Sequence, residues 1–230
     1  MLRVLGILAM CSAAIWSARL CIEDIATASL VVTAMRLESP GYANDFKDDG
    51  AMTVAALSSC RSEIVRSAVE VAVVTKNTVK SFDDQDAWLT AGERADEMIE
   101  HAVACSPDDG EMWARSAQVA SHSPDWAMVL ERLDRSQTLA PADEATLGLR
   151  LAVWADVPVA LNAEADASRR ADIRAVLEHG SPELLRRLLA TAPAWMLPSM
   201  RDEVARLSAA RRQLALLLVP ALGDVEETAV

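Results

Sequence analysis

Apolar residues recur along this chain mainly at intervals of three or four positions, which is the spacing of one face of an α-helix. Clusters of Pro, Gly, Ser and Asp interrupt this pattern and predict the turns between helices. We therefore predict an all-α fold. The main helices are expected over residues 22–36, 51–74, 87–105, 111–122, 123–139, 164–179, 181–192 and 199–218.

Three residues are expected to mark helix ends in the C-terminal part of the chain. Gly180 should end its helix in the left-handed conformation that glycine adopts without strain. Ser181, which a proline follows, should begin the next helix as its N-cap. Ser199 has the same expected role at the start of the last helix.

The longest apolar run, residues 4–18, lies near the N-terminus between Arg3 and Arg19. As a helix it would span about 22 Å, against roughly 30 Å of membrane hydrocarbon. The flanking arginines can reach the lipid headgroups, so the run predicts a short transmembrane anchor within residues 1–21. A cleaved signal peptide, with the small residues 26–28 as its cleavage pattern, is the first alternative. A buried N-terminal helix of a cytosolic protein is the second.

The charges around this run favour one orientation. Arg3 and the free amino group place the N-terminus in the cytoplasm under the positive-inside rule. We therefore expect a single-pass inner-membrane protein whose body lies in the periplasm, or an exported protein if the signal is cleaved.

Residues 22–50 are expected to form an amphipathic helix and a loop. The Ser-Pro-Gly sequence at 39–41 should end the helix, and the polar residues that follow are typical of a solvated loop. The apolar face of this helix is expected to consist of Ile25, Ala28, Ser29, Val32 and Met35.

A repeat is visible in the middle of the chain. Pro107 and Pro141 lie 34 residues apart, which is the period of the tetratricopeptide repeat, and the residues around them fit its helix–turn–helix pattern. The chain resembles this family over one complete repeat, residues 110–143, although Ala120 stands where the family prefers Tyr. The matching residues are Ala95, Ile99, Ala102 and Pro107 in a preceding half-repeat, and Trp113, Ala117, Leu133, Ser136 and Pro141 in the complete one.

The resemblance implies a short α-solenoid that binds proteins and is not an enzyme. We expect its repeat core over residues 51–156, irregular helices over 157–220 and a disordered tail over 221–230. The layout is similar to that of short membrane-anchored alpha-proteobacterial proteins, which resemble accessory components of surface-polysaccharide assembly or export. The expected function is a scaffold for envelope proteins. An all-α ligand-binding protein or enzyme is the alternative.

Composition narrows the classes of partner. The chain is 52% hydrophobic and 24% charged, which favours a packed fold over disorder. Its net charge of −12 argues against nucleic-acid binding, which needs clustered Lys and Arg. Residues 169–212 contain nine arginines and five acidic residues, so an anionic glycan is an alternative partner for this segment.

The cysteines and one histidine are the candidates for chemistry. Cys60 and Cys105 are the two cysteines outside the N-terminal segment, and an oxidising periplasm would favour a disulfide between them. Two separately buried thiols are the alternative. His101 and Cys105 lie four residues apart on one helix, which is half of a zinc site, but the sequence shows no second pair of ligands. We therefore predict no metal, no cofactor and no catalytic residue.

Overall fold

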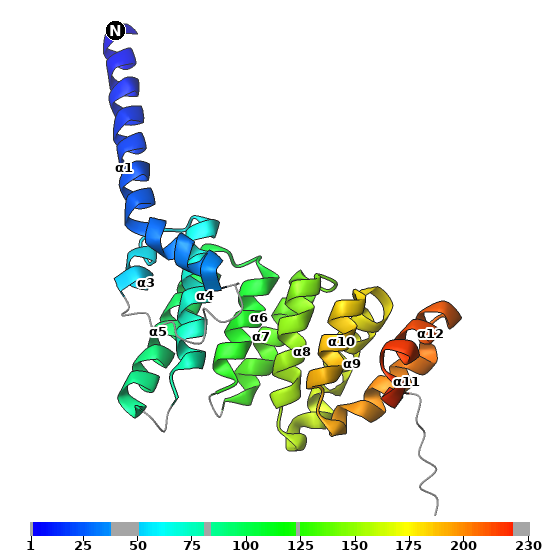
Figure 1. The fold of residues 1–230 in the computed structure, drawn as a ribbon. Coiled ribbons are helices and arrows are strands. Elements are labelled where there is room, and N and C mark those ends of the chain that lie inside the picture. Colours follow the sequence, from blue (N-terminus) through cyan, green and yellow to red (C-terminus); the bar gives the residue numbers. More distant parts are fainter. Residues whose placement is uncertain (1, 38–50, 81–83, 123–124, 223–230) are drawn as a thin grey trace, which may run out of the picture. The chain divides into compact units, whose positions relative to one another are not determined.

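The computed structural model describes residues 2–37, 51–80, 84–122 and 125–222 (Figure 1). Within these ranges every regular element is an α-helix or a 3₁₀ helix and there is no strand, so the predicted all-α class is confirmed. The chain divides into two compact units, Met1–Pro107 and Asp108–Val230. The predicted repeat core, residues 51–156, extends across this division. The predicted helix stop at 39–41, the loop after it and residues 223–230 of the predicted tail lie outside the described residues.

The N-terminal unit consists of α1 (Leu2–Leu37), α3 (Ala51–Ala56), α4 (Ser62–Thr78) and α5 (Gln85–Cys105). Helix α4 lies at the centre of the unit, because it packs against each of the other three helices. Its buried hydrophobic residues are mostly β-branched or small. The core includes Val65, Ala68, Val69, Val71 and Ala72 of α4, and Ala91, Met98 and Ile99 of α5.

Helix α1 buries a different face from the predicted one. Thr27, Leu30, Ala34 and Leu37 are buried against the unit, whereas Ile25 of the predicted face is 79% exposed. The predicted face is therefore wrong. Both sides of the helix carry apolar residues at helical spacing, so periodicity alone could not decide which side packs against α4. No helix in the described part of the chain is long and apolar enough to cross a membrane.

The helix predicted over residues 51–74 is interrupted. Helix α3 ends at Ala56, and α4 begins only at Ser62. In the connection, the Ser59 hydroxyl accepts a hydrogen bond from the Arg61 backbone N–H at 3.1 Å. Serine side chains that bond the nearby backbone in this way compete with helical hydrogen bonds, which explains the break. Cys60 consequently lies in a connecting segment and not within a helix.

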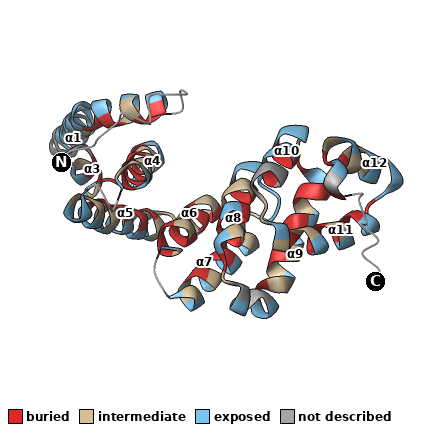
Figure 2. Ribbon diagram, turned by 60° about the horizontal axis from the view of Figure 1, so that its bottom comes forward, coloured by how far each residue is buried: buried red, intermediate tan, exposed pale blue. Residues whose placement is uncertain are grey.

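The C-terminal unit is an array of consecutive helices that share one hydrophobic core. Helix α6 packs against α7 and α8, while α9 contacts α7, α8, α10, α11 and α12. Figure 2 shows the buried residues on the sides of these helices that face their neighbours. The α-helices are α6 (Gly110–Ala120), α7 (Trp126–Leu139), α8 (Glu144–Asp156), α9 (Asn162–His179), α10 (Pro182–Thr191), α11 (Leu197–Arg206) and α12 (Ala209–Leu218). Short 3₁₀ turns are η1 (Val159–Leu161), η2 (Ala194–Met196) and η3 (Pro220–Leu222).

Aspartates begin three successive helices of this unit. The side chains of Asp109, Asp125 and Asp143 accept backbone N–H groups at the starts of α6, α7 and α8. Such N-caps satisfy donors that have no partner within the helix. Helix α7 therefore begins after Asp125, and residues 123–124, where the sequence predicted its start, lie outside the described residues.

Three of the predicted helix ends differ in the structure. Ser199 is not an N-cap, because α11 begins at Leu197, with Pro198 in its first turn, and Ser199 lies inside the helix. Gly180 has φ −62° and ψ 148°, so it is extended and not left-handed. A Cβ at this position would lie 2.7 Å from the carbonyl oxygen of Val176, which explains the need for glycine. The helix predicted over 199–218 is two helices, because the chain turns after Arg206 and Ser208 caps α12. The predicted N-cap at Ser181 is confirmed, since its side chain accepts the Leu184 N–H.

Candidate functional site

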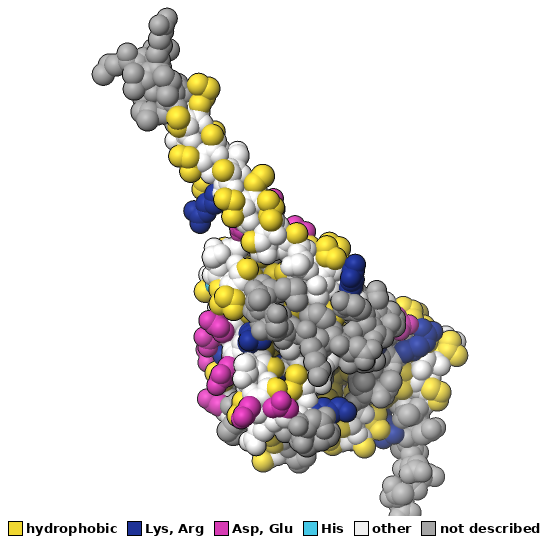
Figure 3. All heavy atoms as spheres, turned by 60° about the vertical axis from the view of Figure 1, so that its left-hand side comes forward, with side chains coloured by type: hydrophobic (Ala, Val, Ile, Leu, Met, Phe, Trp, Pro, Cys, Tyr) yellow, Lys and Arg dark blue, Asp and Glu magenta, His cyan; other side chains and the backbone are white. Residues whose placement is uncertain are grey.

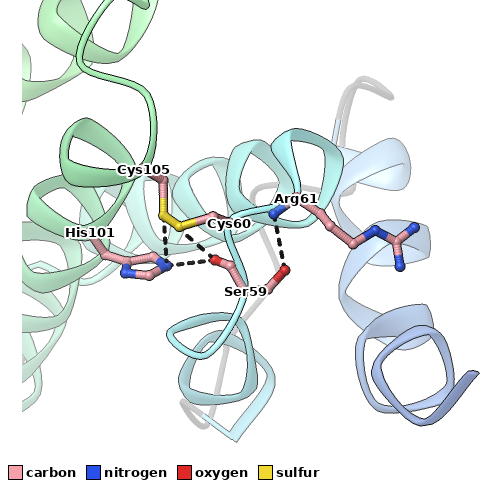
Figure 4. Close-up of a disulfide and its surroundings, with 5 residues drawn as sticks. All are labelled: Ser59, Cys60, Arg61, His101 and Cys105. Atoms are coloured by element: carbon pink, nitrogen blue, oxygen red, sulfur yellow. Dashed lines mark hydrogen bonds between the residues drawn. A yellow bond between two sulfur atoms is a disulfide. The ribbon is translucent and has the colours of Figure 1, made fainter. Parts of the chain in front are cut away.

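The structure brings Cys60 and Cys105 together in a disulfide within the N-terminal unit (Figure 4). Their sulfur atoms are 1.97 Å apart and their Cα atoms 5.3 Å apart. The bridge joins the connection between α3 and α4 to the last residue of α5. Cys60 is exposed and Cys105 is half-buried, so one side of the bridge faces solvent.

His101 lies beside this disulfide. Its Nε2 atom is 2.7 Å from the Ser59 carbonyl oxygen and 3.5 Å from Cys105 Sγ. A carbonyl oxygen can only accept a hydrogen bond, so Nε2 carries the proton in this arrangement. Figure 4 shows the imidazole directed at Ser59 and the disulfide, while the Arg61 side chain points away from them toward α1.

The structure adds Cys60 to His101 and Cys105, which the sequence had identified as half of a metal site. One ligand atom each from Cys60, His101 and Cys105 lie within 4.8 Å of one another. His101 and Cys105 share a face of α5 because they are four residues apart. Cys60 is distant in sequence and reaches the cluster through the packing of α4 against α5, so spacing along the chain could not reveal it.

A groove of about 450 Å³ lies next to the cluster and is also part of the N-terminal unit. Cys60 belongs both to the cluster and to the wall of this groove, and its neighbour Ser59 lines the same wall. At the edge of the groove, the Arg61 guanidinium donates a hydrogen bond to Asp24 of α1 and forms an ion pair with it. This hydrogen bond raises the pKa of the Arg61 guanidinium. The opposite wall is contributed by α1 and includes Trp16, Arg19, Leu20, Ile22, Glu23 and Ala26.

The residues that match the repeat pattern mostly occupy core positions in their own units. Trp113 is half-buried, and the Arg135 guanidinium lies 5.9 Å from the centre of its ring. Pro107 and Pro141 are exposed at turns after α5 and α7. The buried members are Ala95, Ile99 and Ala102 in the N-terminal unit, and Ala117, Leu133 and Ser136 in the C-terminal unit.

Arginines of the segment proposed for anionic glycans have partners inside the fold. Arg170 donates to Asp166 at 2.7 Å and to Asp202 at 3.0 Å. Arg174 donates to Glu203 at 2.8 Å. Arg211 donates to backbone carbonyls near the end of α9. Part of the basic charge of this segment therefore serves the packing of the C-terminal unit.

Comparisons with known protein families, with curated proteins and with solved structures found no match for this chain. Its function therefore has to be inferred from its own residues. Two features of the N-terminal unit stand out: the cluster around the disulfide, and the apolar side chains that α1 leaves exposed.

Proposed function

We propose that this protein is a non-catalytic scaffold of the bacterial envelope, which is tethered by its first helix and binds other envelope proteins. The observation that carries this proposal is the exposure of large apolar side chains along α1. Single exposed apolar residues are common, but a continuous set of them marks an interaction surface. The set consists of Met10, Ile15, Trp16, Ile22, Ile25, Val32 and Met35, which are 47–79% exposed.

The arrangement of α1 suits a tether. The buried residues Thr27, Leu30, Ala34 and Leu37 attach the C-terminal half of the helix to α3 and α4. The N-terminal half extends away from the other helices of its unit (Figure 1). Figure 3 shows hydrophobic side chains distributed along the described part of this extension. We propose that residues 4–18 enter the inner membrane and that the body lies in the periplasm, where the disulfide would form.

The second half of the exposed set suits a helical partner. Ile22, Ile25 and Val32 follow one another at intervals of three and seven residues. These intervals are those of the a and d positions of a coiled coil, whose side chains interlock with a facing helix. We therefore propose that the part of α1 beyond residue 18 binds an apolar helix of an envelope protein. An anionic glycan is a less favoured partner.

Helices α6 to α9 are proposed to form a tetratricopeptide-like stack. Helices α6 and α7 pack as a pair, α8 and α9 pack as the next, and α8 contacts α6 while α9 contacts α7. Contacts of this kind between successive pairs are what a helical repeat requires. This chain is similar in layout to proteins that resemble accessory components of surface-polysaccharide assembly. We therefore propose that it acts in surface-polysaccharide assembly or export.

Membrane attachment is tested by placing a charge in the apolar run. Met10→Arg should shift the protein from carbonate-washed membranes into the soluble fraction, because Met10 lies near the middle of residues 4–18 and an arginine at the centre of a membrane helix costs about 2.5–3.5 kcal/mol of insertion free energy. Leu217→Arg is the control, since it places an arginine at a large apolar side chain that is 76% exposed on α12, outside α1. Equal membrane retention of both variants, or release of the unaltered protein by carbonate, would contradict the tether.

Partner binding is tested on the same helix beyond the apolar run. A photo-crosslinking residue at position 25 should join the protein to a defined envelope protein in intact membranes, and Val32→Glu should abolish that product. A crosslinker at position 217 is the matched control, because this side chain is equally exposed but lies on α12. The same products from both positions would show that α1 has no specific partner.

A further inference from the structure

We propose that Cys60, Cys105 and His101 form a binding site for one Zn²⁺ ion when the disulfide between the two cysteines is reduced. This inference is independent of the scaffold function, since it concerns the chemistry of the cluster alone. Two thiolates and an imidazole are the ligand types that Zn²⁺ takes from proteins.

Two of the three ligand atoms already have the separation that a tetrahedral zinc site requires. In a tetrahedral site with Zn–S near 2.3 Å and Zn–N near 2.0–2.1 Å, a sulfur and a nitrogen ligand lie about 3.5 Å apart. The distance between His101 Nε2 and Cys105 Sγ is 3.5 Å. Both residues project from the same face of α5, whose backbone fixes their spacing.

The third ligand requires a small movement. Tetrahedral geometry with these bond lengths separates two sulfur ligands by about 3.8 Å, so Cys60 Sγ must move away from Cys105 Sγ after reduction. The three ligand atoms already lie within 4.8 Å of one another. Cys60 belongs to the connection between α3 and α4, where no helical hydrogen bonds hold it in place. Because Cys60 is exposed, water can take the fourth position.

Reduction of the disulfide precedes binding of the metal. A phosphine reductant gives two electrons to the disulfide and takes the oxygen atom of a water molecule to become the phosphine oxide, and the two protons of that water convert the two sulfurs to thiols. Zn²⁺ then binds both sulfurs as thiolates and releases those two protons. The proton of His101 moves from Nε2 to Nδ1, so that Nε2 can coordinate the metal and its hydrogen bond to Ser59 is lost. The disulfide and the zinc site therefore exclude each other, and the redox state of the surroundings selects between them.

The test uses the full chain in detergent with Cys11 and Cys21 changed to Ser, because these are the other two cysteines of the sequence. The protein is reduced with a phosphine, freed of it under argon and titrated with Co²⁺, followed by Zn²⁺. We expect one equivalent of Co²⁺ with sulfur-to-cobalt charge-transfer absorption and the visible bands of a tetrahedral ion. Zn²⁺ should displace it, and the oxidised protein should bind neither ion at the cluster.

Two variants separate this site from adventitious binding. His101→Ala should weaken Zn²⁺ binding by more than about tenfold, since loss of even an outer-shell partner costs 10–100-fold. His179→Ala, at the exposed end of α9, should bind as tightly as the unaltered protein. The proposal is overturned if the reduced protein takes up no stoichiometric metal, whether or not it stays folded. It is also overturned if His101→Ala leaves the affinity unchanged or if the oxidised protein gives the same cobalt spectrum.

Discussion

Arg150 and Asp172 form a two-pronged ion pair inside the C-terminal unit, with side chains that are 0% and 1% exposed. The Nε and Nη2 atoms of Arg150 donate to the two oxygens of Asp172, each at 2.9 Å. Trp154 and Gln137 donate to the same carboxylate at 2.7 and 2.9 Å. The network joins α7, α8 and α9, and it satisfies the carboxylate with several donors.

Removing the charge of Asp172 should therefore be costly. Asp172→Asn leaves the Arg150 guanidinium buried without a counter-charge, so we expect the free energy of unfolding to fall by about 3–5 kcal/mol. Asp202→Asn is the control, because Asp202 pairs with Arg170 at the surface and such pairs contribute roughly 0–1 kcal/mol. Urea denaturation followed by circular dichroism measures both. Equal effects of the two substitutions would show that the buried pair has no special role.

Two glycines should respond in opposite directions to the same substitution. A Cβ on Gly110 would lie 2.5 Å from the Cβ of Ala140, whereas a Cβ on Gly92 would meet nothing within 4 Å. Gly110→Ala should lower the free energy of unfolding by about 1–3 kcal/mol through overpacking where α6 begins. Gly92→Ala should raise the free energy of unfolding by about 0.4–1 kcal/mol. Position 92 lies within a helix, where alanine fits, and alanine leaves the unfolded chain fewer conformations than glycine does. Thermal denaturation of both variants checks the signs, and destabilisation by Gly92→Ala would contradict the structure of α5.

Glu203 should make the stability of the C-terminal unit depend on pH. Burial alone would raise the pKa of this carboxyl group, but hydrogen bonds and positive charge from Arg174, with Arg206 and Arg170, lower it below the ordinary value of 4.5. A lowered pKa means that the folded state binds the proton less tightly than the unfolded state. Its stabilising contribution is therefore complete above about 4.5 and is lost as the pH falls through the lowered value.

The measurement is urea denaturation of the unaltered protein and of Glu203→Gln across this acidic range. We expect the difference in unfolding free energy between the two proteins to shrink as the pH falls. The Gln variant lacks the titrating group, so a difference that stays constant would assign the acid sensitivity to other carboxylates.

The disulfide should stabilise the N-terminal unit. It links residues separated by 45 positions, for which the loop-entropy relation gives about 4 kcal/mol. Reduction of the oxidised protein, in buffer with a metal chelator, should therefore shift its urea midpoint downward. Cys60→Ser should show the lower midpoint with or without reductant, and it should also remove the mobility difference between reducing and non-reducing gels. A reductant effect that persists in Cys60→Ser would assign the change to Cys11 or Cys21.

Local sequence patterns predicted much of the secondary structure. Helical spacing of apolar residues, few strand formers and turn-forming clusters were enough for the all-α class and for most helices. Ser181 was correctly predicted as an N-cap because a cap depends on backbone groups only two or three residues away. The breaks after Ala56 and Arg206 were missed, since serines within an apolar pattern can either remain helical or bond the nearby backbone.

Residue types and their spacing along the chain identify the groups that carry chemistry: two cysteines outside the apolar run, a histidine one helical turn from the second of them, and apolar positions throughout the first helix. How these groups are used depends on the packing of the helices. This packing selects which face of α1 is buried, brings Cys60 to His101 and Cys105, and encloses Arg150 with Asp172. The physical reason is that periodicity and capping report interactions within one helix, whereas these outcomes depend on contacts between helices that are distant along the chain.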